Sequence, residues 1–428
     1  MSGLLTSQGG MTMKRSVRRT SPKQNRREFL IKTGGALAAA AIASPPIMTG
    51  AAEAVNIGAL YPTTGSMAQI GVGCVAAAKL AVEMVNDAGG IKSLGGAKIN
   101  LVVADTGPSV ETATNAAQRL LSQGKLSAFT CCFLSSFSLA ASEIGERLQV
   151  PMLTFSYTDV LVRRGYKYTF RDSSGADFPV KAAADLLKKE AAKIGKTIRT
   201  VALAGDNTAA SVAYFKSLAE VLPISDIRIV LNRVWTPPLT DAIPVALAIR
   251  DANPDVIFLG ATTFDDSVGI IRAFNATGVK KLALGNGAQF VTPEFFDALG
   301  PQQAEGVMTT QGTAITKDPY AAEFLKRFRE RTNIRWTVHD TTSVYSHLWI
   351  VKEALEKAAS ADPKKLRDVL ASIHITTPPP TAFTGVDIQY DGAGQNPKAP
   401  TFIVQWQDGV PLLIAPGEFA VAPLKWPS

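Results

Sequence analysis

The chain has 428 residues, of which 46% are hydrophobic and 19% are charged, and this composition excludes an intrinsically disordered protein. Its formal charge of +8 is concentrated at one end, because residues 1–54 carry eight basic side chains against two acidic ones and leave a net charge of +2 on the rest. The charge therefore gives no support to nucleic-acid binding by the folded part of the chain.

The first 54 residues are predicted to be an export signal that is removed after transport. Basic residues precede a run of small apolar residues from Gly34 to Ala43, and Ala52-Glu53-Ala54 follows as an A-x-A cleavage pattern. About ten apolar residues are too few to span a bilayer, so no membrane anchor is expected here. The run Arg26-Arg27-Glu28-Phe29-Leu30 resembles the twin-arginine export signal, and a general secretory signal with a chance Arg-Arg pair is the alternative. We therefore expect a soluble mature protein in the periplasm.

Three cysteines, Cys74, Cys131 and Cys132, do not make a disulfide framework. Neighbouring cysteines are geometrically poor partners for each other, and Cys74 lies on a predicted helix. We expect all three to be buried free thiols. The residue directly after the cleavage pattern is Val55 and not a cysteine, so a lipid-anchored product is not expected.

From Val55 onward, short β-branched runs alternate with helical segments, a pattern that predicts parallel sheets with crossover helices. The first unit is expected to contain strands Ile57–Leu60, Ile99–Ala104, Ala128–Cys132 and Met152–Phe155, and helices that include Val72–Met84, Val110–Ser122 and Ser138–Leu148. The turn Thr64-Gly65-Ser66 lacks the lysine and the glycine spacing of a phosphate-binding loop. We expect it to form one lip of a cleft instead.

The alternation restarts after Tyr168–Ser174 and predicts a second doubly wound unit of about the same size. This unit is expected to contain strands Val201–Ala204, Ile227–Val234, Val256–Leu259 and Leu282–Leu284, and helices Asp177–Ala192, Ser211–Val221, Asp241–Ala252 and Asp265–Thr277. Two similar α/β units in series indicate a molecule with two lobes.

The last part of the chain is too short for a third domain, so its elements are expected to complete the two lobes. They are predicted to be helices Pro319–Thr332, Thr341–Ala359 and Pro363–Ser372, strand Val386–Tyr390, and a hairpin of Thr401–Gln407 and Val410–Ile414. We assign residues 55–173 and 307–376 to lobe 1 and residues 174–306 and 377–428 to lobe 2. Several crossings between the lobes would make a hinge.

The sequence lacks the usual catalytic patterns. Gly195-Lys196-Thr197 imitates the end of a phosphate loop but precedes a strand, and no G-x-S-x-G nucleophile elbow is present. The three histidines, His339, His347 and His374, do not have metal-ligand spacing. We therefore expect no enzyme activity, no metal and no cofactor, with a Cys131 or Cys132 nucleophile and a distant histidine as the alternative.

Hydroxyl side chains follow two neighbouring strands of the first unit. Ser135 and Ser136 come after the third strand and open a helix, where free N–H groups favour an anion, and Ser156 and Thr158 come after the fourth. Plain helix capping is the alternative for any one of these serines. Two such clusters at neighbouring strand ends favour a ligand site.

Several runs of the chain resemble the branched-chain amino acid-binding family of periplasmic proteins, the type I substrate-binding components of ABC importers. They are residues 64–71 (TGSMAQIG), residues 80–91 (LAVEMVNDAGGI) and Tyr390–Asn396, and the likeness extends over nearly the whole mature chain. The resemblance implies a bilobed periplasmic-binding-protein type I fold of two doubly wound parallel-sheet lobes joined by three hinge crossings. It also implies closure of the lobes over a small solute, delivery of that solute to permease subunits in the inner membrane, and a monomer.

The resemblance also implies positions for the solute. Its carboxylate would be held by Ser135 with Ser136 beside it, and groups after the fourth strand would be those of Ser156 and Thr158. The rest of the solute would touch Ile70 and an aromatic residue that corresponds most nearly to Phe264.

One departure from the family concerns the solute's ammonium group. Family members hold this group with a carboxylate in the segment that matches Gly285–Gln289, where this chain has Asn286 and Gln289 but no acid. Asp265 or Asp266 would have to supply the charge, because a buried unpaired ammonium is costly. The solute is thus expected to be a branched-chain or other amino acid, an amide or a small carboxylate. A ligand-sensing receptor domain of the same fold is the alternative function.

Overall fold

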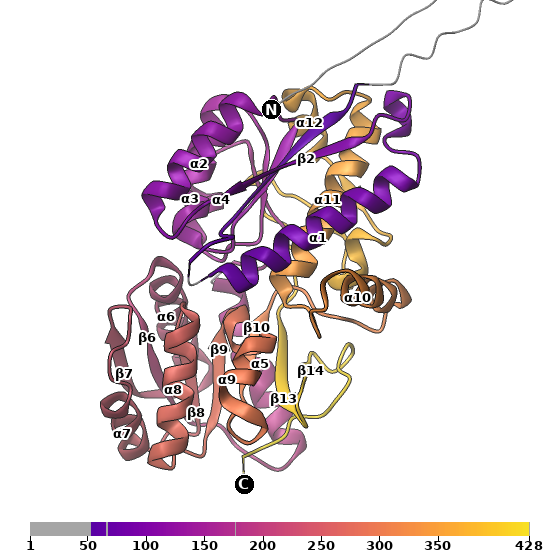
Figure 1. The fold of residues 1–428 in the computed structure, drawn as a ribbon. Coiled ribbons are helices and arrows are strands. Elements are labelled where there is room, and N and C mark those ends of the chain that lie inside the picture. The colour runs from indigo at the N-terminus through magenta and orange to yellow at the C-terminus, as the bar shows by residue number, and fades with distance from the viewer. Residues whose placement is uncertain (1–52, 66, 176, 428) are drawn as a thin grey trace, which may run out of the picture. The chain divides into compact units, whose positions relative to one another are not determined.

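Two β-sheets organise the part of the chain that the structure describes (Figure 1). The structure is a computed structural model that describes residues 53–65, 67–175 and 177–427, all within one unit of the chain. The predicted twin-arginine segment and apolar run lie outside the described residues. We call the two parts built around these sheets the five-stranded half and the seven-stranded half.

The five-stranded half is built on an all-parallel sheet with the order β2-β1-β3-β4-β5. Its strands are β1 (Val55–Tyr61), β2 (Ile99–Asp105), β3 (Ala128–Cys131), β4 (Met152–Thr154) and β5 (Thr169–Arg171). The connecting helices are α1 (Ala68–Asp87), α2 (Val110–Gln123), α3 (Ser135–Leu148) and α4 (Val160–Arg163), with a 3₁₀ turn at Lys92–Leu94. Buried side chains of α1 pack on one face of the sheet and those of α2 and α3 on the other. Both faces are therefore covered, as parallel sheets require.

The seven-stranded half has the strand order β14-β13-β10-β9-β8-β6-β7. Its strands are β6 (Thr200–Asp206), β7 (Arg228–Trp235), β8 (Val256–Gly260), β9 (Leu282–Asn286), β10 (Met308–Gln311), β13 (Phe402–Gln407) and β14 (Val410–Ala415). Its helices are α5 (Asp177–Lys193), α6 (Ala209–Val221), α7 (Ile243–Ala252), α8 (Phe264–Thr277) and α9 (Pro293–Ala304), with 3₁₀ turns at Leu222–Ser225 and Ala288–Val291. Helices α5 and α6 cover one face, and α7, α8 and α9 cover the other.

The late helices return to the five-stranded half. They are α10 (Pro319–Thr332), α11 (His339–Ala358) and α12 (Pro363–Leu370), followed by the short antiparallel pair β11 (His374–Ile375) and β12 (Ile388–Gln389), with a 3₁₀ turn at Pro380–Phe383 between them. Helix α11 packs beside α1 (Figure 1). Over the described residues the chain passes between the two halves after β5, after β10 and after β12, which gives the three crossings expected for a hinge.

Two of the crossings do not lie where the lobe boundaries were predicted. Strand β10 pairs with β9 and β13 in the seven-stranded sheet, so the second crossing follows Gln311 and not residue 306. Residues 380–396, predicted to belong to lobe 2, pack on the five-stranded half, where the Phe383 ring lies 5.8 Å from the Tyr345 ring and the Tyr390 ring 5.1 Å from the Phe170 ring. Strand pairing thus places β10, and aromatic contacts with positions distant in sequence place residues 380–396.

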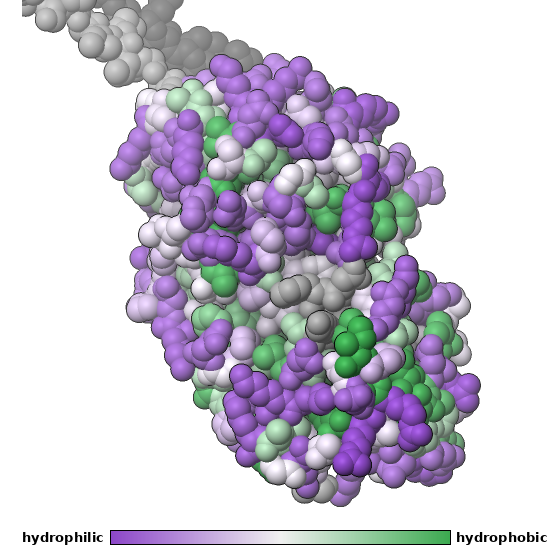
Figure 2. Space-filling view, turned by 180° about the vertical axis from the view of Figure 1, so that it is seen from behind, coloured by the Kyte–Doolittle hydropathy of each residue, from purple (hydrophilic) through white to green (hydrophobic). Residues whose placement is uncertain are grey.

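The antiparallel edge of the seven-stranded sheet is the hairpin that the sequence predicted. Strands β13 and β14 are antiparallel to each other, and β13 is antiparallel to β10. The tight turn at Asp408-Gly409 leaves no room for a crossover helix, so the two strands can pair only as a hairpin. Hydrophilic residues predominate on the molecular face shown in Figure 2, in keeping with apolar cores buried under the helices.

Candidate functional site

A cavity lies where strand ends of both halves meet, and together with the solvent at its mouth it encloses about 480 Å³. Most of its lining follows the carboxyl ends of parallel strands, the edge at which α/β folds bind ligands. The five-stranded half contributes Met67, Ile70, Phe133, Leu134, Ser135, Phe155, Tyr157, His339 and Asp340. The seven-stranded half contributes Ala210, Thr262, Asn286, Gly287, Ala288 and Gln289. Both halves therefore touch the same space, which suits a site that is completed when they approach.

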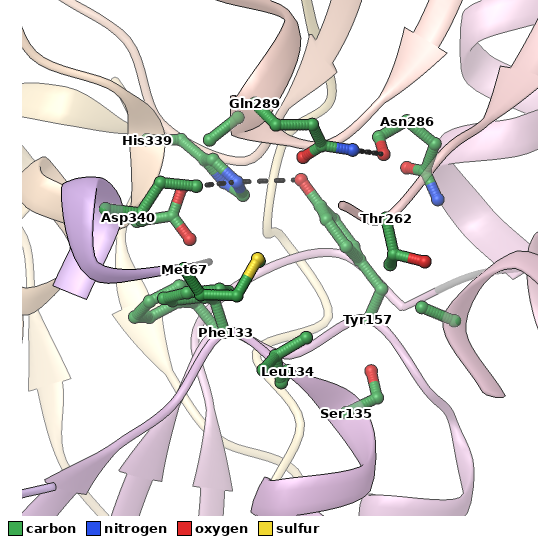
Figure 3. Close-up of a pocket in the computed structure, with 15 residues that line it drawn as sticks. Met67, Phe133, Leu134, Ser135, Tyr157, Thr262, Asn286, Gln289, His339 and Asp340 are labelled. Carbon is green, nitrogen blue, oxygen red and sulfur yellow. Dashed lines mark hydrogen bonds and ion pairs between the residues drawn. The ribbon is translucent and has the colours of Figure 1, made fainter. Parts of the chain in front are cut away.

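Tyr157 and His339 form the centre of the polar lining (Figure 3). Their rings stack with centroids 5.5 Å apart, and the Tyr157 hydroxyl lies 3.2 Å from Nδ1 of His339. The backbone N–H of Gly312 also donates to this Nδ1, at 3.4 Å. Because Nδ1 accepts from both groups, we assign the ring proton to Nε2. Burial raises the pKa of Tyr157, as does the nearby charge of Asp340, so the Tyr157 hydroxyl remains a donor.

Asp340 places a carboxylate in the cavity wall beside this pair. Its Oδ2 lies 3.1 Å from Nε2 of His339, and the Asp340 side chain is almost fully buried. Among the described residues, no hydrogen bond to this oxygen is formed. A buried carboxylate oxygen without a hydrogen bond is costly, so Asp340 is suited to accept one from a bound molecule.

The start of α3 supplies hydrogen-bond donors at another part of the cavity. The helix begins at Ser135, three residues earlier than predicted, and its N-cap residue Leu134 has no capping side chain. Ser135 and Ser136 therefore stand in the first turn and do not cap it. The first-turn N–H groups of a helix, together with its dipole, favour an anion. The Ser135 hydroxyl lies at this point in the lining and accepts the N–H of Thr158 at 3.4 Å.

Three of the eight predicted site residues line the cavity, namely Ile70, Ser135 and Gln289. Gln289 also joins the two loops of its half, because its amide nitrogen donates to the carbonyls of Ala261 and Asn286. Apolar side chains of Met67, Phe133, Leu134 and Phe155 form the rest of the wall with Ile70. The cavity thus combines an apolar surface with a few placed polar groups, as small-molecule sites do.

Two of the predicted serines point away from the cavity. Ser136 lies in an outer groove between α2 and α3. Ser156 is fully buried below the loop, where its hydroxyl lies 2.6 Å from that of Ser138 and donates to the carbonyl of Cys132 at 2.8 Å. The Ser156 hydroxyl therefore stabilises the local fold, whereas Ser136 lines a different pocket.

The other three predicted positions also lie outside the cavity lining. Thr158 is buried, and Phe264 packs against the core at the start of α8. Asp265 is exposed to solvent, whereas the carboxylate of Asp266 accepts from the Trp235 indole at 2.9 Å and from the N–H of Leu239 at 2.8 Å. The acid of this site is accordingly Asp340, which the sequence analysis did not select.

The structure does not support the alternative of a cysteine nucleophile, because neither candidate thiol is accessible. Cys131 and Cys132 are fully buried under α2 and α3, and neither lines the cavity. Burial raises the pKa of Cys132, so its nucleophilic thiolate is disfavoured. Cys74 is likewise buried as a free thiol, as predicted.

Comparisons with known proteins agree with this fold. The model of the periplasmic binding protein family matches residues 54–410. The Leu/Ile/Val-binding protein homolog 8 of Brucella melitensis is 26% identical over 394 residues, which cover 90% of this chain and 96% of that protein.

Two solved structures illustrate the likeness. The substrate-binding protein LivJ of Streptococcus pneumoniae, in complex with isoleucine, is similar with a TM-score of 0.73 and 21% identity over 84% of this chain and 98% of that one. A solute-binding protein of an ABC transporter from R. palustris, in complex with benzoate, is similar with a TM-score of 0.72 and 17% identity over 87% and 98% of the two chains. Both structures have the type I periplasmic-binding-protein fold found here.

Proposed function

Because the chain is a solute-binding protein of the periplasmic binding protein family, we propose that its cavity captures a small organic carboxylate that also carries an N–H group. The family has an extracytoplasmic location and serves transporter permeases. Amino acids and small carboxylates with an amide or amine are the solutes that fit this description.

The observation that carries the proposal is the presence of an acid and an anion-favouring helix start in one cavity. At one part of the lining, Ser135 and the first-turn N–H groups of α3 are suited to a carboxylate. At another part, Oδ2 of Asp340 lacks a hydrogen bond and is suited to an ammonium or amide N–H. The apolar wall around Phe133 would contact the body of the solute. Asp340 removes the main reason to disfavour an amino acid, which was the lack of an acid near the site.

Capture of the solute is proposed to proceed by closure of the two halves. A solute can shift this equilibrium only by its differential affinity for the closed state, so it must contact both halves. Thr262 and Gln289 of the seven-stranded half face the same cavity as Ser135 and Tyr157. The three chain crossings would form the hinge, and the two halves would be the moving lobes.

Export is proposed to follow the twin-arginine route, which delivers a folded protein to the periplasm, where it acts as a monomer. Replacement of both Arg26 and Arg27 by Lys should block export of the full chain, because the route recognises the arginine pair. Continued export of this variant, measured by fractionation and immunoblotting, would favour the general secretory route.

A thermal-shift screen of the purified mature chain tests the proposed solute class. The panel should hold amino acids, amide-bearing acids, dicarboxylates, aromatic acids, uncharged amides and sugars. A compound at 100 times its Kd stabilises the folded protein by about 2.7 kcal/mol, so a true solute raises the melting temperature by several degrees. We expect compounds with both a carboxylate and an N–H group to give the largest shifts. The proposal fails if only uncharged compounds stabilise the protein.

A further inference from the structure

A buried arginine lies directly behind the cavity-lining loop that follows β4. Arg171 is the last residue of β5, immediately before the first crossing, and is 2% exposed. Its guanidinium donates to three successive backbone carbonyls, those of Ser156 at 3.4 Å and of Tyr157 and Thr158 at 3.0 Å. It also forms an ion pair with Asp159, at 2.6 Å. One side chain thus holds a whole turn of loop by its carbonyl oxygens.

This arrangement sets the direction of the loop's N–H groups. In a trans peptide the N–H of one residue points opposite to the carbonyl of the residue before it. Carbonyls drawn toward Arg171 therefore turn the following N–H groups away from it. The N–H of Thr158 accordingly points to the hydroxyl of Ser135, which lines the cavity. The N–H of Thr158 thus faces the side where a solute carboxylate is proposed to bind.

The same arginine joins two of the three crossings. Its backbone N–H donates to the carbonyl of Gly394, and its carbonyl accepts from Asn396, both at 2.8 Å. Its Nε donates to the side chain of Gln395, whose amide nitrogen donates to the carbonyl of Ser173 at 2.9 Å. The segments before the first and third crossings are thus bonded to each other and to the loop that carries Tyr157.

We propose that Arg171 is a positioning residue of the solute site, which holds the backbone of residues 156–158 so that the N–H of Thr158 faces Ser135 at the cavity, and which ties that loop to the hinge. The role in solute binding rests on the proposed function, whereas the role in ordering the loop does not. An arginine that only stabilised the fold would affect all parts of the five-stranded half alike when removed. Removal of a positioning residue should loosen the loop of residues 156–158 more than the rest of that half.

Hydrogen–deuterium exchange of the mature chain tests the ordering role without a solute. In Arg171→Ala the loop loses its charge-assisted hydrogen bonds, so amides of residues 152–160 should exchange at least about tenfold faster, whereas those of α10 should be unchanged. Arg171 and Asp159 line a pocket that is open to solvent, which gives a guanidinium ion access to the vacated position. Millimolar guanidinium chloride should therefore slow the exchange of these amides again. Methylammonium should not, because it lacks the planar array of N–H donors.

A matched control and two further variants complete the test. Arg367→Ala removes a half-buried arginine that donates to the carbonyl of Lys167 and does not touch the loop, so exchange at residues 152–160 should not change. If Arg171→Ala does not fold, Arg171→Lys gives the same test, because lysine cannot bond to the carbonyls and to Asp159 together. Gln395→Leu is a second substitute, because it removes the side chain that accepts from Nε of Arg171. Unchanged exchange in the loop, or an equal rise in every peptide that guanidinium does not reverse, would overturn the proposal.

L-Isoleucine and benzoate are the solute probes for the binding role, measured by isothermal titration calorimetry. A probe that binds the unmodified chain should bind Arg171→Ala at least about tenfold more weakly, with recovery on addition of guanidinium. Equal affinity would overturn the link from loop order to solute binding. If the unmodified chain binds neither probe, isoleucine and benzoate are excluded as solutes. The exchange experiment then still decides whether Arg171 positions the loop.

Discussion

The Oδ2 atom of Asp340 lies 3.1 Å from Nε2 of His339, and the two side chains are buried side by side in the cavity wall. His339 in turn stacks on Tyr157, so the acid ends a row of three residues that begins at the β4 strand end (Figure 3). The contact between Asp340 and His339 does not have hydrogen-bond geometry, so Oδ2 of Asp340 accepts no hydrogen bond from the described residues and can accept one from a bound molecule. In the proposed function, Asp340 is therefore the residue that would accept the solute's N–H group.

Replacement of Asp340 by Asn should separate binding from stability. The amide keeps the size of the side chain but removes the charge, so the affinity for an amino acid solute should fall by about 10- to 100-fold. The free energy of unfolding without solute should stay the same or rise, because the wild-type carboxylate oxygen is buried without a hydrogen bond. Calorimetric titration and urea unfolding of the same preparation measure both quantities.

Asp266→Asn is the matched control for this prediction. Its carboxylate is equally buried but accepts from Trp235 and Leu239, so the substitution should lower the free energy of unfolding by about 1–3 kcal/mol and leave solute affinity within about twofold. If Asp266→Asn weakened binding and Asp340→Asn did not, the acid of the site would have to be reassigned.

Neighbouring serines at the start of α3 make a second paired prediction. Ser135 lines the cavity, whereas Ser136 lies in the outer groove between α2 and α3. Ser135→Ala should weaken binding of the screened carboxylate by about tenfold, the value of one hydrogen bond to a charged group, and Ser136→Ala should not change it. Titration calorimetry with both variants measures this. Equal effects of the two substitutions would contradict a carboxylate at the helix start.

The sequence predicted the elements of the fold best where local chain geometry determines their ends. Helix Pro319–Thr332 was predicted with the bounds that the structure shows, because Pro319 stands at its N-terminus and Asn333 adopts the left-handed conformation at its end. Helix α9 was missed, because Gly300 and Pro301 interrupt its pattern. Strand β10 was assigned to the wrong lobe, because four buried residues carry no periodic signal that identifies their neighbours.

Side-chain direction limited the prediction of single site residues. One step along a helix turns the side chain by about 100°, so Ser135 and its neighbour Ser136 cannot both face the cavity. Along the extended loop after β4, successive side chains point to opposite sides, so Tyr157 faces the cavity and Ser156 does not. The sequence placed the hydroxyl cluster at the correct strand ends but did not identify which members face inward.

Asp340, the acid of the site, could not have been predicted by inspecting the residues that follow the strands. Asp340 follows no strand, because it stands in the first turn of α11, after the second crossing. Only the return of α11 beside α1 brings it to the cavity. His339 was considered in the sequence as a metal ligand and rejected, because the histidines lack metal-ligand spacing. Its contact with Tyr157 joins residues 182 positions apart in sequence.

The three cysteines should be unreactive in the folded protein. All are buried, and burial raises the pKa of Cys74 and Cys132. Titration with a thiol reagent should detect almost no reaction of the mature chain in buffer and three thiols in denaturant. Solute binding should survive the treatment. Rapid native reaction of one thiol with loss of binding would show that a cysteine reaches the site.

Asp105 provides a pH-dependent prediction about the turn before α1. Its Oδ1 accepts from the N–H of Thr63 at 2.8 Å, and its Oδ2 accepts from the hydroxyl of Thr64 at 2.6 Å. Burial alone would raise the pKa of Asp105, but the hydrogen bonds from Thr64 and from the N–H groups of Gly107 and Thr63 hold it below its ordinary value. A carboxyl with a lowered folded pKa contributes stability above its ordinary pKa and loses it as the pH falls through the folded value.

Asp105→Asn should therefore lower the free energy of unfolding by about 1–2 kcal/mol at neutral pH, and the difference from wild type should shrink below about pH 4. Asp255, whose pKa is likewise lowered by hydrogen bonds from Arg199 and Thr200 in the seven-stranded half, is the control. Asp255→Asn should show the same dependence on pH. Only Asp105→Asn should also weaken solute binding, because the turn that Asp105 holds leads into α1, whose Ile70 lines the cavity. Urea unfolding between pH 3 and 8, combined with titration calorimetry at neutral pH, distinguishes the two variants. A stability difference that persisted unchanged at the lowest pH would show that the Asp105 charge does not hold the turn.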